Sequence, residues 1–253
     1  MTAYQRLPSA PSRPVGQPDM PGAATARDMR PTLPVDLAWI DGRDRAVWDN
    51  RLLPDTAQIT DAIAALARGA LLHGETGPTA IEDLMPGDRV RTRSGGTARI
   101  EWIGSMEMSG PDCRLFRVSA NAFGGAGPTI DMILGEGAHI LIESPKCQPL
   151  VGGPCAFAPI AAFEDGYSVT AITPPGAVMV YGLACSGQEA VLAAGLPIET
   201  YHPARATARS LTRSALSDMA RLFPHLAGGA GFGAPRIPHL TMSEAQSLAG
   251  SGF

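Results

Sequence analysis

Cysteine and histidine are the side chains of this sequence best suited to covalent chemistry. Cys185 could act as a nucleophile, because a thiolate attacks a carbonyl carbon when a nearby base takes up the thiol proton. His139 or His202 could be that base. A single cysteine in a strand is more often a small buried apolar side chain, and His202, followed by proline, is expected to cap the end of a domain by hydrogen bonding. Cys185 is therefore either a reactive thiol or a part of the core.

The other residues that could do chemistry form no recognisable site. Four cysteines occur without a C-x-x-C pair, so we expect no zinc site. Asp131, Glu136 and Glu143 do not have a recognisable paired-carboxylate spacing. The glycine-rich stretch 229–234 has neither the preceding strand nor the following helix that phosphate binding requires. We expect neither a metal nor a cofactor.

The composition favours a turn-rich β protein with few helices. The 253 residues include 29 glycines and 23 prolines, and only 6% are aromatic. A net charge of -4 with interspersed signs gives no reason to expect nucleic acid or an anionic membrane as partner. No apolar run approaches the ~20 residues that span a bilayer. We expect a cytoplasmic protein, with export without a cleavable signal left open, and any partner would be an unknown protein.

Composition and periodicity divide the chain into four segments. They are a disordered N-terminal tail (1–34), a strap with a short helix (35–68), a β-domain (69–204) and a C-terminal helical tail packed on that domain (205–253). The first segment is rich in Pro, Ala and Gly and has almost no aliphatic periodicity, so it cannot offset the entropy of ordering. Within the domain, the proline content of stretch 144–163 predicts an irregular insertion.

The strap holds two tryptophans and the apolar period of a short helix. Trp39 and Trp48 are large side chains that favour burial, so we expect the strap to pack along the domain. A strip that binds a partner is the alternative. Apolar residues spaced three or four apart predict a helix over residues 55–67, which Gly69 would end.

Three motifs in order organise the β-domain. Gly69–Val90, GALLHGETGPTAIEDLMPGDRV, reads as strand, turn, strand and turn. Trp102-Ile103-Gly104 ends a hairpin, and Gly195–Pro203, GLPIETYHP, closes the domain. Together these motifs resemble the Hint domain shared by hedgehog autoprocessing domains and inteins, and the tail resembles the segment after the Hint domain in one group of bacterial proteins. The resemblance covers about residues 63–248 and implies an all-β Hint fold with a few peripheral helices.

The resemblance also implies where chemistry would take place. A Hint domain begins with a Cys, Ser or Thr that attacks the carbonyl of the preceding residue, and a histidine on a later strand assists. Counting back from Gly69 places the nucleophile position at Ala65, whose methyl group cannot attack. His139 falls near the assisting histidine once one residue is inserted, and a structural or surface histidine is the alternative. Gln188 stands where a late histidine is common, which leaves only Glu189.

Three functions are consistent with these residues. The favoured one is a non-catalytic Hint module with a structural or protein-interaction role, because Ala65 stands at the nucleophile position. The second is self-processing, by autoproteolysis or a splicing-type acyl shift, through a displaced nucleophile such as Cys185 with His139 as its base. The third is binding of a small ligand or peptide in the former active cleft, with His139 and Glu189 as polar lining.

Overall fold

The computed structural model describes residues 30–111, 113–205, 213–228 and 231–250. Of the predicted tail, residues 1–29 lie outside this part of the chain, and residues 32–34 belong to the first strand. Residues 206–212 of the predicted C-terminal tail are also outside it. The described residues from Pro31 onward form one compact unit, which contains the two sheets of this part of the chain.

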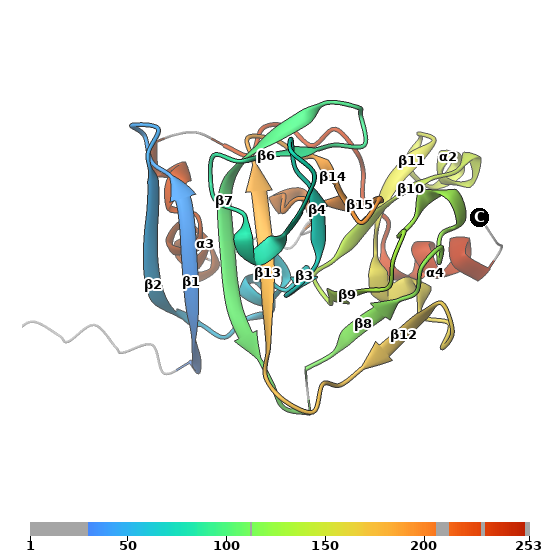
Figure 1. Ribbon diagram of the computed structural model, residues 1–253, viewed down its shortest axis with the longest axis horizontal. Coiled ribbons are helices and arrows are strands. Elements are labelled where there is room, and N and C mark those ends of the chain that lie inside the picture. The colour runs from blue at the N-terminus through green and yellow to red at the C-terminus, as the bar shows by residue number, and fades with distance from the viewer. Residues whose placement is uncertain (1–29, 112, 206–212, 229–230, 251–253) are drawn as a thin grey trace, which may run out of the picture. The chain divides into compact units, whose positions relative to one another are not determined.

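The larger of two antiparallel sheets in the described chain has nine strands. Their order is β12-β8-β9-β3-β13-β7-β1-β2, with β6 paired to β7 (Figure 1). β7 and β13 pair over the length of β13 and form the middle of the sheet. The strands are β1 (Thr32–Ile40), β2 (Ala46–Pro54), β3 (Leu66–Ala67), β6 (Arg89–Arg91), β7 (Thr97–Met108), β8 (Leu115–Val118), β9 (Met132–Gly135), β12 (Val169–Ile172) and β13 (Val178–Cys185).

The smaller sheet has six short strands in the order β11-β10-β15-β14-β4-β5. The turn between β14 and β15 consists of Ala194 and Gly195, both at positive φ (47° and 86°), as a two-residue hairpin with the twist of its strands requires. The strands are β4 (Leu71–His73), β5 (Pro78–Ala80), β10 (His139–Glu143), β11 (Cys155–Pro159), β14 (Ala190–Ala193) and β15 (Leu196–Glu199).

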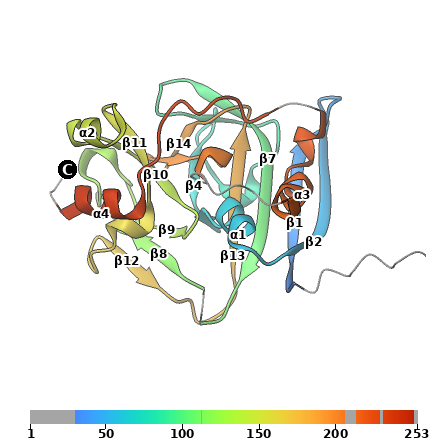
Figure 2. The same cartoon turned by 180° about the vertical axis from the view of Figure 1, so that it is seen from behind.

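Helices lie around the two sheets (Figures 1 and 2). Thr241 caps the last helix, since its hydroxyl accepts from the Glu244 N–H (3.3 Å) while the Glu244 carboxylate accepts from the Thr241 N–H (2.8 Å). None of the described helices has the length and apolar character needed to cross a membrane. The α-helices are α1 (Ala57–Ile63), α2 (Gln148–Val151), α3 (Arg213–Leu222) and α4 (Met242–Gly250), and the 3-10 turns are Ile81–Asp83, Gly124–Ala126, Pro145–Cys147, Ile160–Phe163, Pro203–Arg205 and Pro224–Gly228.

Buried apolar side chains of the described residues gather in two main clusters. One includes Phe116, Ile140 and Ile198, from strands of both sheets. The other surrounds Trp102, whose indole N–H donates to the Leu222 carbonyl (2.8 Å) and so attaches α3 to the larger sheet. The mostly β architecture with few helices confirms the predicted fold class.

The helix predicted over residues 55–67 is shorter than expected. α1 ends at Ile63, and Ala64 leaves the helical region at φ -85° and ψ 55°. Leu66–Ala67 is the strand β3, which lies between β13 and β9. The sheet hydrogen bonds available at this central place outweigh the helical periodicity of the sequence, which is a weak local preference.

The predicted strap is a β-hairpin in the larger sheet. β1 pairs with β2 over nine residues and with β7 from Asp36 to Trp39. Trp39 is buried, but Trp48 is 59% exposed, so the prediction that both tryptophans are buried was wrong for Trp48. Successive strand residues point to opposite faces, and Trp48 lies on the face opposite Trp39.

The stretch 144–163, predicted to be irregular, contains a regular strand. β11 pairs with β10 from His139 opposite Pro159 to Glu143 opposite Cys155. Pro159 is the last residue of this strand, and β11 is an edge strand of its sheet. A proline is tolerated there because no ladder hydrogen bond requires its missing N–H.

Candidate functional site

Ala65 lies at the point where α1 turns into β3. Its N–H donates to the Tyr181 carbonyl (3.2 Å), and its own carbonyl accepts from the Gly135 N–H (3.0 Å). The carbonyl of Ala64, which a nucleophile at position 65 would attack, accepts from the Gly137 N–H (2.8 Å). The backbone of β9, β13 and the loop after β9 therefore fixes this peptide bond on both sides.

Glycines allow the last turn of α1 to approach these neighbouring segments closely. A side chain at these positions would occupy space that the helix backbone already fills, so only glycine permits the contact. A Cβ atom would overlap a carbonyl oxygen at three positions: Gly135 against Ala64, Gly137 against Asp61 and Gly182 against Ala62.

Acyl transfer requires a hydrogen-bond donor to the carbonyl oxygen and a group that attacks the carbonyl carbon. The geometry at Ala64 and Ala65 provides only the first. A backbone N–H that donates to a carbonyl oxygen, as Gly137 donates to Ala64, is the kind of contact that stabilises negative charge on that oxygen. The side chain at position 65 is a buried methyl group, which cannot attack a carbonyl carbon. A carbonyl is held in place here with no attacking group beside it on the next residue.

A buried ion pair of Glu199 and Arg205 braces the same loop. Arg205 Nε lies 2.7 Å from Glu199 Oε2, and the two side chains are 3% and 0% exposed. The guanidinium also donates to the Gly137 carbonyl (2.8 Å) and to the Glu199 carbonyl (3.2 Å). Because Gly137 holds the Ala64 carbonyl, the end of the domain is connected to its beginning through Arg205.

The second carboxylate oxygen of Glu199 attaches the C-terminal part of the chain. It lies 2.8 Å from His239 Nε2 and accepts from the Gln188 amide (3.1 Å). Burial raises the pKa of Glu199, but the charge of Arg205 and the hydrogen bond from His239 outweigh this effect and lower the pKa to about 2. Gln188 also accepts from the backbone N–H groups of Arg236 and Ile237 (both 2.8 Å). An amide suits this place because it both donates and accepts.

His139 lies beside this ion pair. Its ring is 5.9 Å from that of His239 and nearly perpendicular to it, and its Nδ1 is 3.3 Å from the Gly137 carbonyl. Burial, helped by the charge of Arg205, lowers the pKa of His139 to about 3, so the ring is neutral near pH 7. Asp61 lies nearby, and burial raises its pKa against the opposing effect of Arg205. A histidine with so low a pKa has almost no protonated form with which to protonate a leaving amine.

Cys185 does not belong to the buried cluster around Glu199. It ends β13, is 1% exposed, and burial raises its thiol pKa far above the ordinary value, which disfavours the reactive thiolate. It borders a pocket together with Ser186 and His225, and His139 is not among the residues that line this pocket. His202 accepts from the Ala204 N–H (3.2 Å) through Nδ1, which is the predicted cap at the end of the domain.

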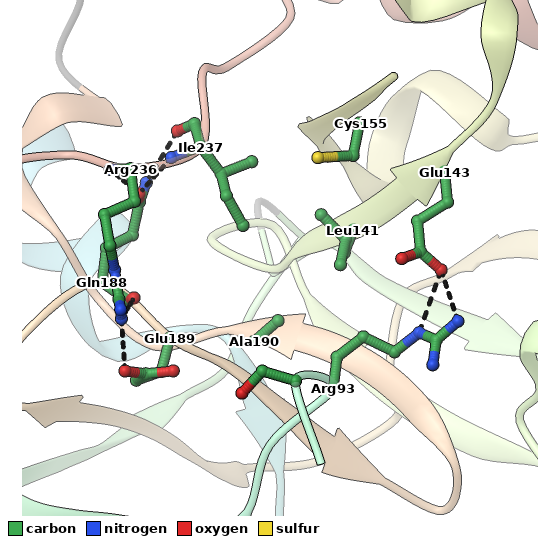
Figure 3. Close-up of a pocket in the computed structure, with 10 residues that line it drawn as sticks. Arg93, Leu141, Glu143, Cys155, Gln188, Glu189, Ala190, Arg236 and Ile237 are labelled. Carbon is green, nitrogen blue, oxygen red and sulfur yellow. Dashed lines mark hydrogen bonds and ion pairs between the residues drawn. The ribbon is translucent and has the colours of Figure 1, made fainter. Parts of the chain in front are cut away.

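Glu189 lines a separate, open pocket (Figure 3). Its carboxylate pairs with Arg236 on one side, and Arg93 pairs with Glu143 (2.7 Å) on the other. The apolar side chain of Leu141 lies between the two ion pairs (Figure 3). His139 is not part of this lining, so the structure does not bring His139 and Glu189 into one cleft.

Sequence reasoning missed four members of the buried cluster, namely Asp61, Glu199, Arg205 and His239. Arg205 lies two residues after the closing motif, which contains Glu199. A pair between these two residues could have been inferred from the presence of an arginine so close to the motif. His239 gave no local signal. It reaches the cluster because residue 239 forms a parallel bridge with Phe157 of β11, a contact between distant parts of the chain.

Comparisons with known proteins agree with the resemblance seen in the sequence. The model of the Hint domain family matches residues 64–205. A bacterial intein-like domain from Clostridium thermocellum is similar in structure at 11% identity and a TM-score of 0.41, over 55% of this chain and 99% of that one. The MchDnaB-1 intein has 15% identity and a TM-score of 0.37, over 55% and 100%. No curated protein matches. Since the family match spans more than half of the chain, this protein belongs to the Hint domain family.

Proposed function

We propose that this Hint domain does not cut its own chain and serves as a folded module with a structural or protein-interaction role. The observation that carries the proposal is the methyl group of Ala65 at the position where the family has its nucleophile. The carbonyl of Ala64 is held by the Gly137 N–H, but the adjacent residue has no atom that can attack it.

The segment before Ala65 supports the proposal. β1 lies inside the larger sheet between β2 and β7, and α1 contributes the buried side chains of Ile59 and Ile63. Cutting the chain between Ala64 and Ala65 would leave residues 31–64 embedded in the domain. Self-processing has a use when it frees the flanking segment, and here that segment is part of the core.

The buried polar cluster has a structural explanation. Glu199 accepts from Arg205, Gln188 and His239, which connect the loop after β9 and the chain near residue 237 to the end of β15. Paired charges that make several hydrogen bonds can be kept in a core without a catalytic task. We interpret the cluster as a set of hydrogen bonds that holds the C-terminal part of the chain against the domain.

The rival function is self-processing through Cys185, and intact mass distinguishes the two. The purified full-length chain is incubated with and without dithiothreitol and then denatured, because fragments would otherwise stay together in the sheet. We expect the parent mass alone. Two masses that sum to the parent mass plus one water, from hydrolysis, or plus one dithiothreitol, from thiolysis, would contradict the proposal. Cys185→Ala then identifies the nucleophile, with Cys155→Ala as the matched control.

A further inference from the structure

β2 is an edge strand of the nine-stranded sheet, and no described strand lies beyond it (Figures 1 and 2). Two of its large apolar side chains, Trp48 and Leu52, are 59% and 60% exposed. They lie four residues apart and therefore on the same face of the strand. This hairpin precedes residue 64, where the match to the Hint family begins.

The backbone of β2 has polar groups that point outward. The Asp41 N–H donates to the Arg45 carbonyl at the hairpin loop, which sets the phase of the alternating β1–β2 ladder. With this phase, the N–H and C=O groups of Trp48, Asn50 and Leu52 face away from β1. The Arg221 guanidinium bonds to the Leu52 carbonyl (2.6 Å), which agrees with an outward direction.

The sequence of β2 is complementary to itself about Asn50. If a second copy pairs antiparallel with Asn50 opposite Asn50, then Trp48 lies opposite Leu52 and Asp49 lies opposite Arg51, each pair occurring twice. Aromatic–aliphatic and opposite-charge pairs are the cross-strand pairs that stabilise a sheet. Within one chain Asp49 and Arg51 already form an ion pair (2.7 Å), so the four charges would alternate across the junction.

We propose that a second copy of this chain binds along β2, joining the two sheets in an antiparallel, two-fold symmetric dimer. The symmetry of the charge and apolar pattern about Asn50 selects the same strand as the partner, as an isologous interface requires. The five residues that would pair, 48–52, contain neither a lysine nor a proline, and Pro54 is the last residue of the strand, outside the paired segment. The Arg221 contact leaves the second lone pair of the Leu52 carbonyl free for the Trp48 N–H of the partner copy. The proposal goes beyond the proposed function and does not depend on it.

Charge-swapped variants of the full-length chain test the pairing by sedimentation velocity over a wide range of concentration. We expect the wild type to form dimers as concentration rises. Asp49→Lys places lysine opposite Arg51, and Arg51→Glu places glutamate opposite Asp49, so each variant alone should dimerise at least about tenfold more weakly. An equimolar mixture restores both opposite-charge pairs and should regain the dimer. Tyr167→Lys is the control and should behave as the wild type. Tyr167 is 86% exposed and lies in the loop before β12, away from β2.

A second measurement covers the case that Arg51→Glu unfolds, since Arg51 also donates to the Arg221 carbonyl. Residues directly opposite in a hydrogen-bonded antiparallel pair have Cα atoms about 5.5 Å apart, within the range of a disulfide. Asn50→Cys should therefore form a covalent dimer on oxidation, and Tyr167→Cys should not. A wild type that stays monomeric, a mixture that does not regain the dimer although both variants are folded, or equal cross-linking at the two positions would overturn the proposal.

Discussion

Glu199 and Arg205 are six residues apart in the sequence, and their side chains meet at 2.7 Å in a place that solvent does not reach. Arg205 donates to the Gly137 carbonyl as well, and Gly137 holds the carbonyl of Ala64. The pair therefore connects Glu199, at the end of β15, to the Ala64 carbonyl near the beginning of the Hint domain. We therefore expect the stability of the fold to depend on this pair.

Glu199→Gln is expected to destabilise the fold strongly. The substitution removes the charge that compensates the buried Arg205, and breaking a buried pair on one side costs about 3–5 kcal/mol. Urea unfolding followed by circular dichroism measures the loss. Asp131→Asn is the matched control, because its pair with Arg117 is half exposed on both sides (51% each), so the variant should lose much less stability than Glu199→Gln. Equal losses for the two variants would contradict the role given to Glu199.

The sequence predicted the scaffold better than the site. The ordered motifs from Gly69 to Pro203 predicted the β structure, because turn residues and alternating apolar positions are local signals. The family was indicated by the resemblance of these motifs to the Hint domain. The end of α1 was misjudged, since the pairing of Leu66 with Leu134 and Tyr181 is a contact between distant segments. The position of His239 depends on the same kind of contact, which no local pattern records.

The exposure of Trp48 could not be predicted for a related reason. A hairpin shows which of its residues share a face, but not which face the rest of the chain covers. Trp39 faces the core that α1 and α3 complete, and Trp48 faces away from it. The sequence predicted a strap, but neither the hairpin nor the place of β2 at the edge of the sheet.

His139 should make the protein less stable as the pH falls below about 6. The pKa of its ring is about 3 in the folded chain and 6.5 ordinarily, so between these values the unfolded chain takes up a proton that the folded chain does not. The free energy of unfolding should fall by up to about 1.4 kcal/mol for each pH unit. Glu199, whose pKa is lowered, acts in the same direction at lower pH, and Asp61, whose pKa is raised, opposes it.

The contribution of His139 is measured as a difference between two proteins. Urea unfolding at several pH values between about 4 and 6 should give a smaller slope for His139→Phe than for the wild type, because the variant lacks the group that titrates only on unfolding. His73→Phe, on β4 and outside the cluster, is the control. Parallel stability curves for the wild type and His139→Phe would show that the ring of His139 is not shielded from protonation.

Gly135→Ala is expected to weaken the junction of α1 and β9. The added methyl group would overlap the Ala64 carbonyl oxygen, which cannot move without breaking its hydrogen bond from Gly137, and overpacking of this kind costs about 1–3 kcal/mol. Gly176→Ala is the matched control, because a Cβ at that position meets nothing within 4 Å and its free energy of unfolding should change by less than about 1 kcal/mol. Both are measured by urea unfolding. A loss at Gly176 as large as that at Gly135 would mean that reduced backbone freedom, and not the close approach of the helix end, sets the cost.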